Sequence, residues 1–156
     1  MSPLRRIRSV TAAAPGLYRA ARDLLGRRDA ARVVIAAALA LGAGIVRARG
    51  RPRMQNAVRH FTWSAWLSLR YGSATAERLT DQHERHSVDA LDSEADLRNN
   101  TAGRAYADRH RDALADDPLA LWRISGIGRR RWRAGRLWAV RGGRVERSAP
   151  TATSRS

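Results

Sequence analysis

The sequence predicts a mostly α-helical, small multi-helix domain that packs around a buried central helix, with a short β-hairpin near the C-terminus. First, apolar residues recur at helical spacing between residues 54 and 71 and cover most sides of that helix, which is typical of a buried helix. Second, other apolar stretches follow the same period and are separated by glycine or proline. Third, Gly142-Gly143 lies between RLWAV and RVER, a pattern that favours a hairpin turn. We expect about five or six helices around residues 54–71.

The length and composition favour one domain. A chain of 156 residues suits a single domain with a modest core. We expect a basic N-terminal segment at 1–28, a helical domain at 29–147 and a disordered polar tail at 148–156. The chain has no cysteine, which excludes a disulfide framework, a thiol nucleophile and a zinc site with cysteine ligands.

Positive charge is concentrated in the two ends of the chain. The formal net charge is +16, and arginine supplies all of the basic charge because the sequence contains no lysine. Residues 1–53 carry 12 Arg and 2 acidic residues, and residues 118–156 carry 10 Arg and 1 acidic residue. The stretch between them, 54–117, carries 11 acidic residues and 8 Arg. Basic flanks favour an anionic partner, either nucleic acid or membrane lipid.

The N-terminal part is expected to contain two helices. Pro15-Gly16 interrupts the basic N-terminal segment, so no apolar region long enough for a signal peptide follows. A short helix is predicted at 17–25, and Asp29 is the expected N-cap of a helix whose apolar body is 33–46. That body spans about 21 Å, less than the roughly 30 Å of a hydrocarbon core. We therefore expect a core helix in a cytoplasmic protein, with membrane association as the alternative.

Two helices are expected after the central one. Ser73 is a suitable N-cap for a helix that runs to about His86, after which an acidic, loop-like segment follows. Ser93 and Asp96 resemble a capping box, so the next helix is predicted to begin near Glu94.

That helix is expected to continue to Leu114, with Gly103 in its interior. Glycine inside a helix costs about 1 kcal/mol relative to alanine, and the close approach of another helix is one reason to accept this cost. Asp117-Pro118 is predicted to start the last helix, with aspartate as N-cap and proline at the first helical position.

Polar residues are embedded in the apolar pattern of the central helices, which is what a functional site requires. The candidate catalytic residues are His60, His83 and Glu84. The candidate substrate-binding residues are Asn56, Arg59, Asp96, Asn99, Asn100 and Arg104.

These residue types suit a hydrolase or a phosphoesterase-like enzyme. His60 or His83 could act as a general base oriented by a neighbouring carboxylate, while an arginine holds an anion. Histidine and carboxylate side chains also bind metal ions, but the HERH segment does not match the HExxH spacing of a zinc site. We assign no metal ligand, and the sequence leaves the cofactor unknown.

Three short motifs carry a resemblance to a known family. NAVRHFTW, DQHE and DLRNNTAGR, which lie within residues 54–106, resemble a family of small bacterial helical domains of unknown function (DUF6973-like). The family pattern is N/D-A-x-R-H-x-x-W, then H-E, then D-x-x-N-N-x-x-G-R. The resemblance implies a site without naming its chemistry. Leu97-Arg98 stands where an apolar residue followed by histidine is common in the family.

Two other interpretations compete with an enzyme. Buried His, Asn and Arg side chains often bond to one another and to helix ends, so the polar residues could form a structural network, and we favour this interpretation. The segment RRRWRAGRLW places Trp132 and Trp138 among arginines, which suits stacking on bases or contact with lipid, unless both rings pack on the domain. The alternative function is therefore a non-enzymatic basic protein that binds nucleic acid or an anionic membrane surface.

Overall fold

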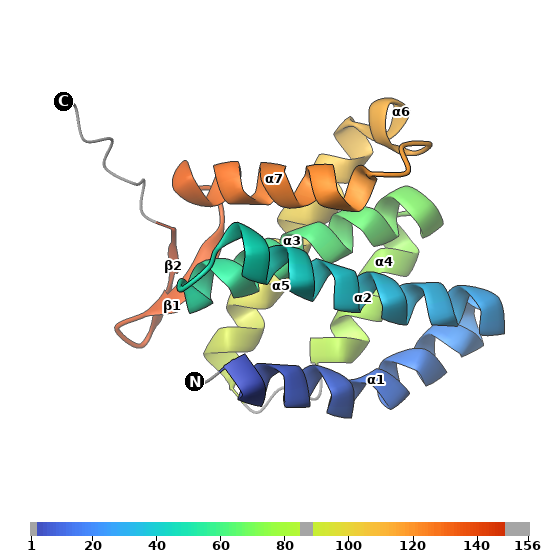
Figure 1. Cartoon of the computed structure of the whole chain (residues 1–156), viewed down its shortest axis with the longest axis horizontal. Helices are drawn as coiled ribbons and strands as arrows, with labels where there is room; N and C mark the ends of the chain where they lie inside the picture. The colour runs from blue at the N-terminus through green and yellow to red at the C-terminus, as the bar shows by residue number, and fades with distance from the viewer. Residues whose placement is uncertain (1–2, 85–88, 149–156) are drawn as a thin grey trace.

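The computed structural model describes residues 3–84 and 89–148, and the side chains of residues 14–82 and 89–148. Within these ranges, seven helices precede a two-stranded antiparallel hairpin (Figure 1). The helices are α1 (Pro3–Leu25), α2 (Arg27–Arg47), α3 (Pro52–Tyr71), α4 (Ser73–Glu84), α5 (Ala90–Arg109), α6 (Arg111–Leu114) and α7 (Ala120–Arg133). The strands are β1 (Trp138–Arg141) and β2 (Arg144–Arg147). The predicted mostly α-helical fold with a C-terminal hairpin is confirmed.

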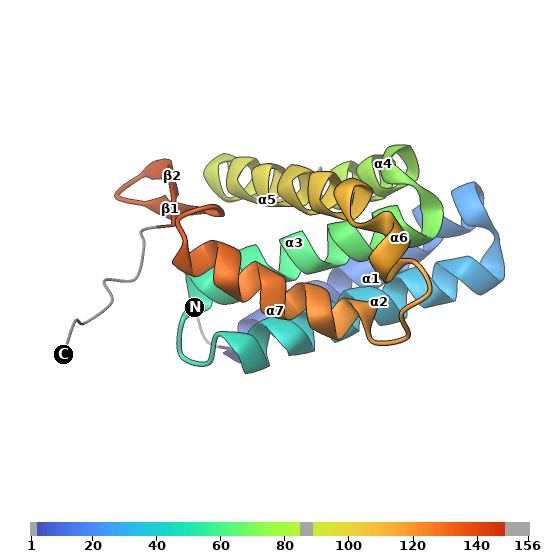
Figure 2. The same cartoon turned by 90° about the horizontal axis from the view of Figure 1, so that it is seen from above.

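Helix α3 is the centre of the domain. It contacts α2, α4, α5, α7 and β1, and 12 of its 20 residues are buried. Figure 2 shows α4 and α5 along one side of α3, and α2 and α7 along the other. The predicted central helix is thus found at its predicted place, because its apolar residues surround most of its circumference.

The core consists of two clusters that α3 joins. In one cluster, Phe61 of α3 packs with Ile124 of α7 and with Leu137, which precedes β1. In the other cluster, Trp63 and Leu67 of α3 pack against residues of α1, α2 and α4. Both clusters contain side chains of α3, so disruption of this helix would disrupt the whole core.

The N-terminal helix is longer than predicted. Helix α1 continues through Pro15 and Gly16, which were expected to interrupt it. Proline removes one backbone hydrogen bond from the helix, and both Pro15 and Gly16 lie on its exposed face. Leu17 and Ala21 of the same helix are buried in the second cluster and hold it on the domain.

Asp29 has a different role from the predicted N-cap. Helix α2 begins at Arg27 with Gly26 at the N-cap position, and Asp29 lies in the first turn. The Asp29 carboxylate accepts hydrogen bonds from the Tyr71 hydroxyl at 3.2 Å and from Arg32 at 2.9 Å. Burial, together with the Asp29 carboxylate, raises the pKa of Tyr71 to about 12. The phenol therefore stays protonated and links the start of α2 to the end of α3.

The start of α5 was also placed wrongly. The helix begins at Ala90, because Asp89 caps it through hydrogen bonds from the backbone N–H groups of Leu91 and Asp92. The capping box predicted at Ser93 therefore lies inside the helix. The end of helix α4 agrees with the sequence pattern as far as Glu84, and residues 85–88 lie outside the described residues.

The end of α5 differs from the prediction of one helix to Leu114. The helix stops at Arg109, and the short α6 follows after one residue. This break places Arg111 so that its guanidinium donates to the backbone oxygens of Ser68 and Leu69 at 3.0 and 3.2 Å. Those carbonyl groups belong to the last turn of α3, where the Ser68 oxygen also accepts from the backbone N–H of Gly72 at 3.0 Å.

Asp117-Pro118 does not begin the last helix. Helix α7 starts at Ala120, with Leu119 at the N-cap position. The Asp117 carboxylate instead accepts a hydrogen bond from the Leu119 backbone N–H at 2.8 Å, which closes the turn before the helix. It also pairs with Arg123 at 2.9 Å.

The hairpin has the predicted turn. Gly142 and Gly143 have φ angles of 53° and 74°, which suit a tight turn that glycine adopts without strain. Val140 pairs with Val145 across the strands. Ser148, the first residue of the predicted tail, is buried and bonds to Leu137, whereas residues 149–156 lie outside the described residues.

Helices α3 and α5 touch through their backbones at Gly103. A Cβ atom at this position would overlap the backbone carbonyl oxygen of Phe61 and lie 3.1 Å from the backbone nitrogen of Ala65. Both are backbone atoms, so no side chain can rotate away to make room. The predicted reason for a glycine inside this helix, the close approach of another helix, is confirmed.

We predict that Gly103→Ala lowers the free energy of unfolding by about 2 kcal/mol, because the cost of overpacking exceeds the helix propensity of alanine. Urea denaturation measures this change. Gly42→Ala is the matched control, since Gly42 lies inside α2 with no atom within 4 Å of an added Cβ. The control should gain up to about 1 kcal/mol. Equal stability of the two variants would contradict the backbone contact.

Candidate functional site

A polar seam follows the contact between α3 and α5. Asn56, His60 and Ser64 are spaced four apart on α3, so they share one face of the helix. The Asn56 amide donates to Asp96 Oδ1 at 2.6 Å, and His60 Nε2 lies 3.1 Å from Asp96 Oδ2. One turn further, the Ser64 hydroxyl donates to the backbone oxygen of Asn100 at 2.8 Å. The seam thus combines two side-chain contacts to one carboxylate with a side chain bonded to the facing backbone.

The His60–Asp96 pair is shielded from solvent. The exposed fraction is 1% for His60 and 6% for Asp96. Arg59 also contacts the His60 ring. A histidine beside a carboxylate is the arrangement of a general base with its orienting group, but the same arrangement also satisfies two buried polar side chains.

Two of the predicted substrate-binding residues hold the fold together. The Asn99 amide donates to the backbone oxygen of Trp138 at 3.0 Å and accepts from its backbone N–H at 2.9 Å. This pair of bonds attaches β1 to α5. Arg104 bonds to Glu77 at 2.9 Å and to Thr80 at 3.4 Å, which links α5 to α4. Neither side chain points toward the His60–Asp96 pair.

Asn100 is a predicted site residue whose side-chain amide has no visible role in the fold of the described residues. Its side chain is fully buried, and its amide nitrogen and oxygen have no hydrogen-bond partner in the part of the chain that the structure describes. An unsatisfied buried polar group costs about 1–3 kcal/mol. The contact of Asn100 with the polar seam is made by its backbone oxygen, which accepts from the Ser64 hydroxyl.

The two remaining candidates, His83 and Glu84, are described by their backbone alone. His83 and Glu84 belong to the last turn of α4, but their side chains lie outside the described residues. Their convergence with His60 therefore stays a prediction. Within the described residues, no group of three or more His, Cys, Asp or Glu side chains could hold a metal ion.

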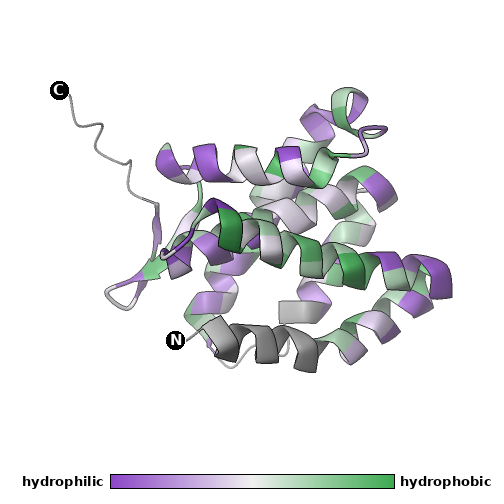
Figure 3. Ribbon diagram, viewed as in Figure 1, coloured by the Kyte–Doolittle hydropathy of each residue, from purple (hydrophilic) through white to green (hydrophobic). Residues whose placement is uncertain are grey.

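A second feature, on α2, was not found by the sequence analysis. The buried face of α2 consists of small residues and one valine: Ala30, Val33, Ala36, Ala40, Ala43 and Gly44. The larger residues Ile35, Leu39 and Val46 point outward and are 58%, 57% and 58% exposed. We call these three residues the α2 stripe; they are separated by four and seven positions, so they share one face. Figure 3 shows the apolar α2 ribbon running across the front of the molecule.

The α2 stripe was missed because residues 33–46 are apolar on nearly every side, which hides the difference between small and large residues. Helix α2 has the length and hydropathy of a membrane span, and it is the only such helix in the described residues. A third of its apolar window is buried inside the domain. The helix is therefore both part of the core and a source of exposed apolar surface.

The exposed apolar surface continues onto α7, which contacts α2. Trp122 is 44% exposed and Leu119 is 57% exposed. The Arg47 guanidinium lies 3.8 Å from the centre of the Trp122 ring, and its Nε donates to the Ser125 hydroxyl at 3.2 Å. Exposed arginines precede the α2 stripe at Arg27, Arg28 and Arg32, and follow it at Arg49 and Arg51.

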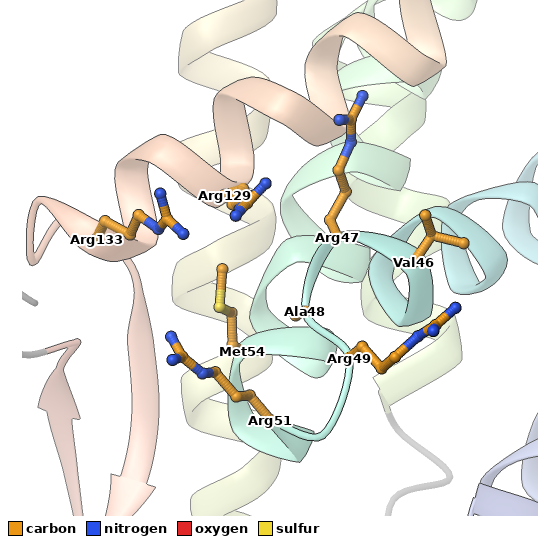
Figure 4. Close-up of a pocket in the computed structure, with 8 residues that line it drawn as sticks. All are labelled: Val46, Arg47, Ala48, Arg49, Arg51, Met54, Arg129 and Arg133. Atoms are coloured by element: carbon orange, nitrogen blue, oxygen red, sulfur yellow. The ribbon is translucent and has the colours of Figure 1, made fainter.

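A pocket of about 270 Å³ lies where the end of α2, the α2–α3 loop and α7 meet (Figure 4). Five arginines line it: Arg47, Arg49, Arg51, Arg129 and Arg133. The other lining residues are Val46, Ala48 and Met54, so no acidic side chain balances the charge. We call this feature the arginine pocket.

The comparisons with known proteins give one match. Residues 45–121 match the family model described as Domain of unknown function (DUF6973), the family to which the resemblance pointed. The match contains the polar seam and ends at the start of α7. Neither the curated proteins nor the solved structures contain a match to this chain.

We predict that His60→Ala lowers the free energy of unfolding by about 2–4 kcal/mol, because it leaves a cavity and removes a partner of the buried Asp96 carboxylate. Chemical denaturation measures the loss. His110→Ala is the control, since His110 is exposed at the end of α5 and should cost well under 1 kcal/mol. A fully stable His60→Ala variant would show that the pair is not needed for folding and would favour a functional role.

Proposed function

We propose a function from the surfaces of this chain, because the family model that residues 45–121 match (DUF6973) carries no known function: peripheral docking on anionic membranes, without catalysis. The observation that carries the proposal is the α2 stripe with exposed arginines at both of its ends. A helix with an apolar outer face and flanking cationic residues is typical of proteins that lie in the membrane interface.

Burial of apolar side chains and attraction between opposite charges both favour this kind of docking. Full burial of an aliphatic side chain contributes about 1.5–3 kcal/mol, so Ile35, Leu39 and Val46 together supply a substantial apolar term. Arginine near an anionic leaflet adds about 1 kcal/mol per side chain. Trp122, which is exposed on α7 and contacts Arg47 of α2, has an apolar ring with a polar N–H, a combination that suits the headgroup region.

A lipid surface fits this chain better than a second copy or a nucleic acid. Two copies that each carry a net charge of +16 repel each other. A nucleic acid offers no apolar surface for the α2 stripe. Trp132 is buried in the core, and Trp138 lies between Arg98 and Arg147, at 4.5 and 4.8 Å from the guanidinium carbons. The two tryptophans of the basic segment thus make contacts within the domain, which disfavours a role in stacking on bases.

Peripheral docking fits better than a membrane span. If α2 crossed the bilayer, Val33 and Ala36 would leave the cluster that contains Trp63 and Leu67. That loss would expose apolar surface of α3 to water. Docking through the outer face alone leaves this packing in place.

We predict that the protein sediments with vesicles of phosphatidylserine and phosphatidylcholine, and that Ile35→Ser/Leu39→Ser weakens binding at least about tenfold, since apolar contact is lost. Higher salt should weaken the binding of the wild type as well. Leu91→Ser/Leu97→Ser on α5 is the control, because both leucines are exposed, at 36% and 38%, and α5 lies across α3 from α2. The control should bind like the wild type. Equal loss in both variants, or no binding by the wild type, would refute the docking surface.

A hydrolase is the second candidate, and the His60–Asp96 contact of 3.1 Å is the observation that favours it. The 1% exposure of His60 places this candidate second, because a general base has to reach its substrate.

We predict no turnover of phosphate or carboxylic esters above the rate without protein. The measurement is a chromogenic assay of the wild type beside His60→Gln, with the thermal transition of both recorded. Turnover that disappears in a folded His60→Gln variant would reverse the order of the two candidates.

A further inference from the structure

The arginine pocket combines high positive charge with a concave shape. Arg129 and Arg133 come from α7, and Arg51 comes from the loop before α3. In Figure 4 these three side chains surround the space beside Met54, whereas Arg49 points away on the other side of the loop. Met54 is 2% exposed and forms an apolar base. An anion in this space would meet guanidinium groups from two directions.

Three of the pocket arginines have no acidic partner in the part of the chain that the structure describes. None of the ion pairs between described residues includes Arg51, Arg129 or Arg133. The Nε of Arg129 is buried and has no hydrogen-bond partner among the described residues. A buried donor without an acceptor is unfavourable, and an oxygen atom of a bound anion would satisfy it.

The start of α3 adds to the positive potential. Arg51 occupies the N-cap position and makes no capping hydrogen bond through its side chain. Backbone N–H groups of the first helical turn point out of a helix N-terminus, where the helix dipole also favours negative charge. Met54, which lines the pocket, belongs to this first turn. The N-terminus of a 20-residue helix therefore acts together with the arginines.

We propose that the arginine pocket binds the terminal phosphate group of a phosphomonoester. Several guanidinium groups can each form paired hydrogen bonds with phosphate oxygens, a geometry that a point charge does not match. The pocket of about 270 Å³ suits one compact dianion rather than an extended polyanion. This site goes beyond the proposed membrane docking, since the phosphate could belong to a lipid headgroup or to a soluble ester.

The test is a calorimetric titration of the full-length protein with inorganic phosphate at pH 8, against chloride at equal ionic strength. We expect saturable binding of one phosphate per chain. Arg51→Gln/Arg133→Gln should weaken it at least about tenfold, because two charge-assisted contacts are lost. Arg19→Gln/Arg144→Gln is the control, since both arginines are exposed, lie outside the pocket and change the net charge equally. The single variant Arg129→Gln tests the buried donor, and thermal transitions confirm that each variant is folded.

The outcomes separate the two sources of phosphate. Preference for vesicles with phosphatidic acid over phosphatidylserine vesicles of equal charge, lost in Arg51→Gln/Arg133→Gln, would identify a lipid headgroup. Phosphate binding without this preference would identify a soluble phosphomonoester. Heat that does not saturate, or equal weakening in the control variant, would overturn the proposal. This titration contains no membrane. Phosphate binding by the arginine pocket can therefore be confirmed even if the vesicle test with Ile35→Ser/Leu39→Ser refutes membrane docking.

Discussion

The close approach of α5 to α3 is the constraint on which the rest of the domain depends. The missing Cβ at Gly103 allows the two backbones to touch, and this contact brings Asp96 within hydrogen-bonding distance of Asn56 and His60. The same helix then attaches the hairpin through Asn99. Several polar residues of α3 and α5 therefore serve one helix–helix contact, which also explains why polar residues occur within an apolar pattern.

Local sequence patterns, which involve only a few neighbouring residues, predicted much of the fold. The central helix, the glycine turn of the hairpin and the role of Gly103 were foreseen in this way. The caps were not, because Asp89 and Ser93 are both suitable capping residues and only the path of the chain selects between them. For the candidate site, helical spacing indicated that Asn56 and His60 share a face. It could not show that Asn99 turns toward the hairpin, since one residue of rotation, about 100°, changes the helix that a side chain meets.

Net charge alone would overstate the capacity of this protein for binding. Arg131 lies over the rings of Phe61 and Tyr106, and its burial lowers the pKa of its guanidinium. Arg111 and Arg104 bond to neighbouring helices, as described above. Arginine in this domain is therefore also a packing residue, whose long side chain and flat end cover aromatic rings and helix ends. Arg51, Arg129 and Arg133 of the arginine pocket differ from these, since no ion pair or ring contact between described residues involves them.

The use of arginine without lysine fixes how this surface can be regulated. A guanidinium keeps its proton at every physiological pH, and the lining of the arginine pocket contains no histidine. Acidification or mild alkalinity would leave its positive charge unchanged, and lysine acetylation has no target anywhere in the sequence. Control over what this surface holds then falls to the ionic strength, to the ionisation of the ligand, to competing anions, or to arginine methylation, which keeps the charge but removes hydrogen-bond donors.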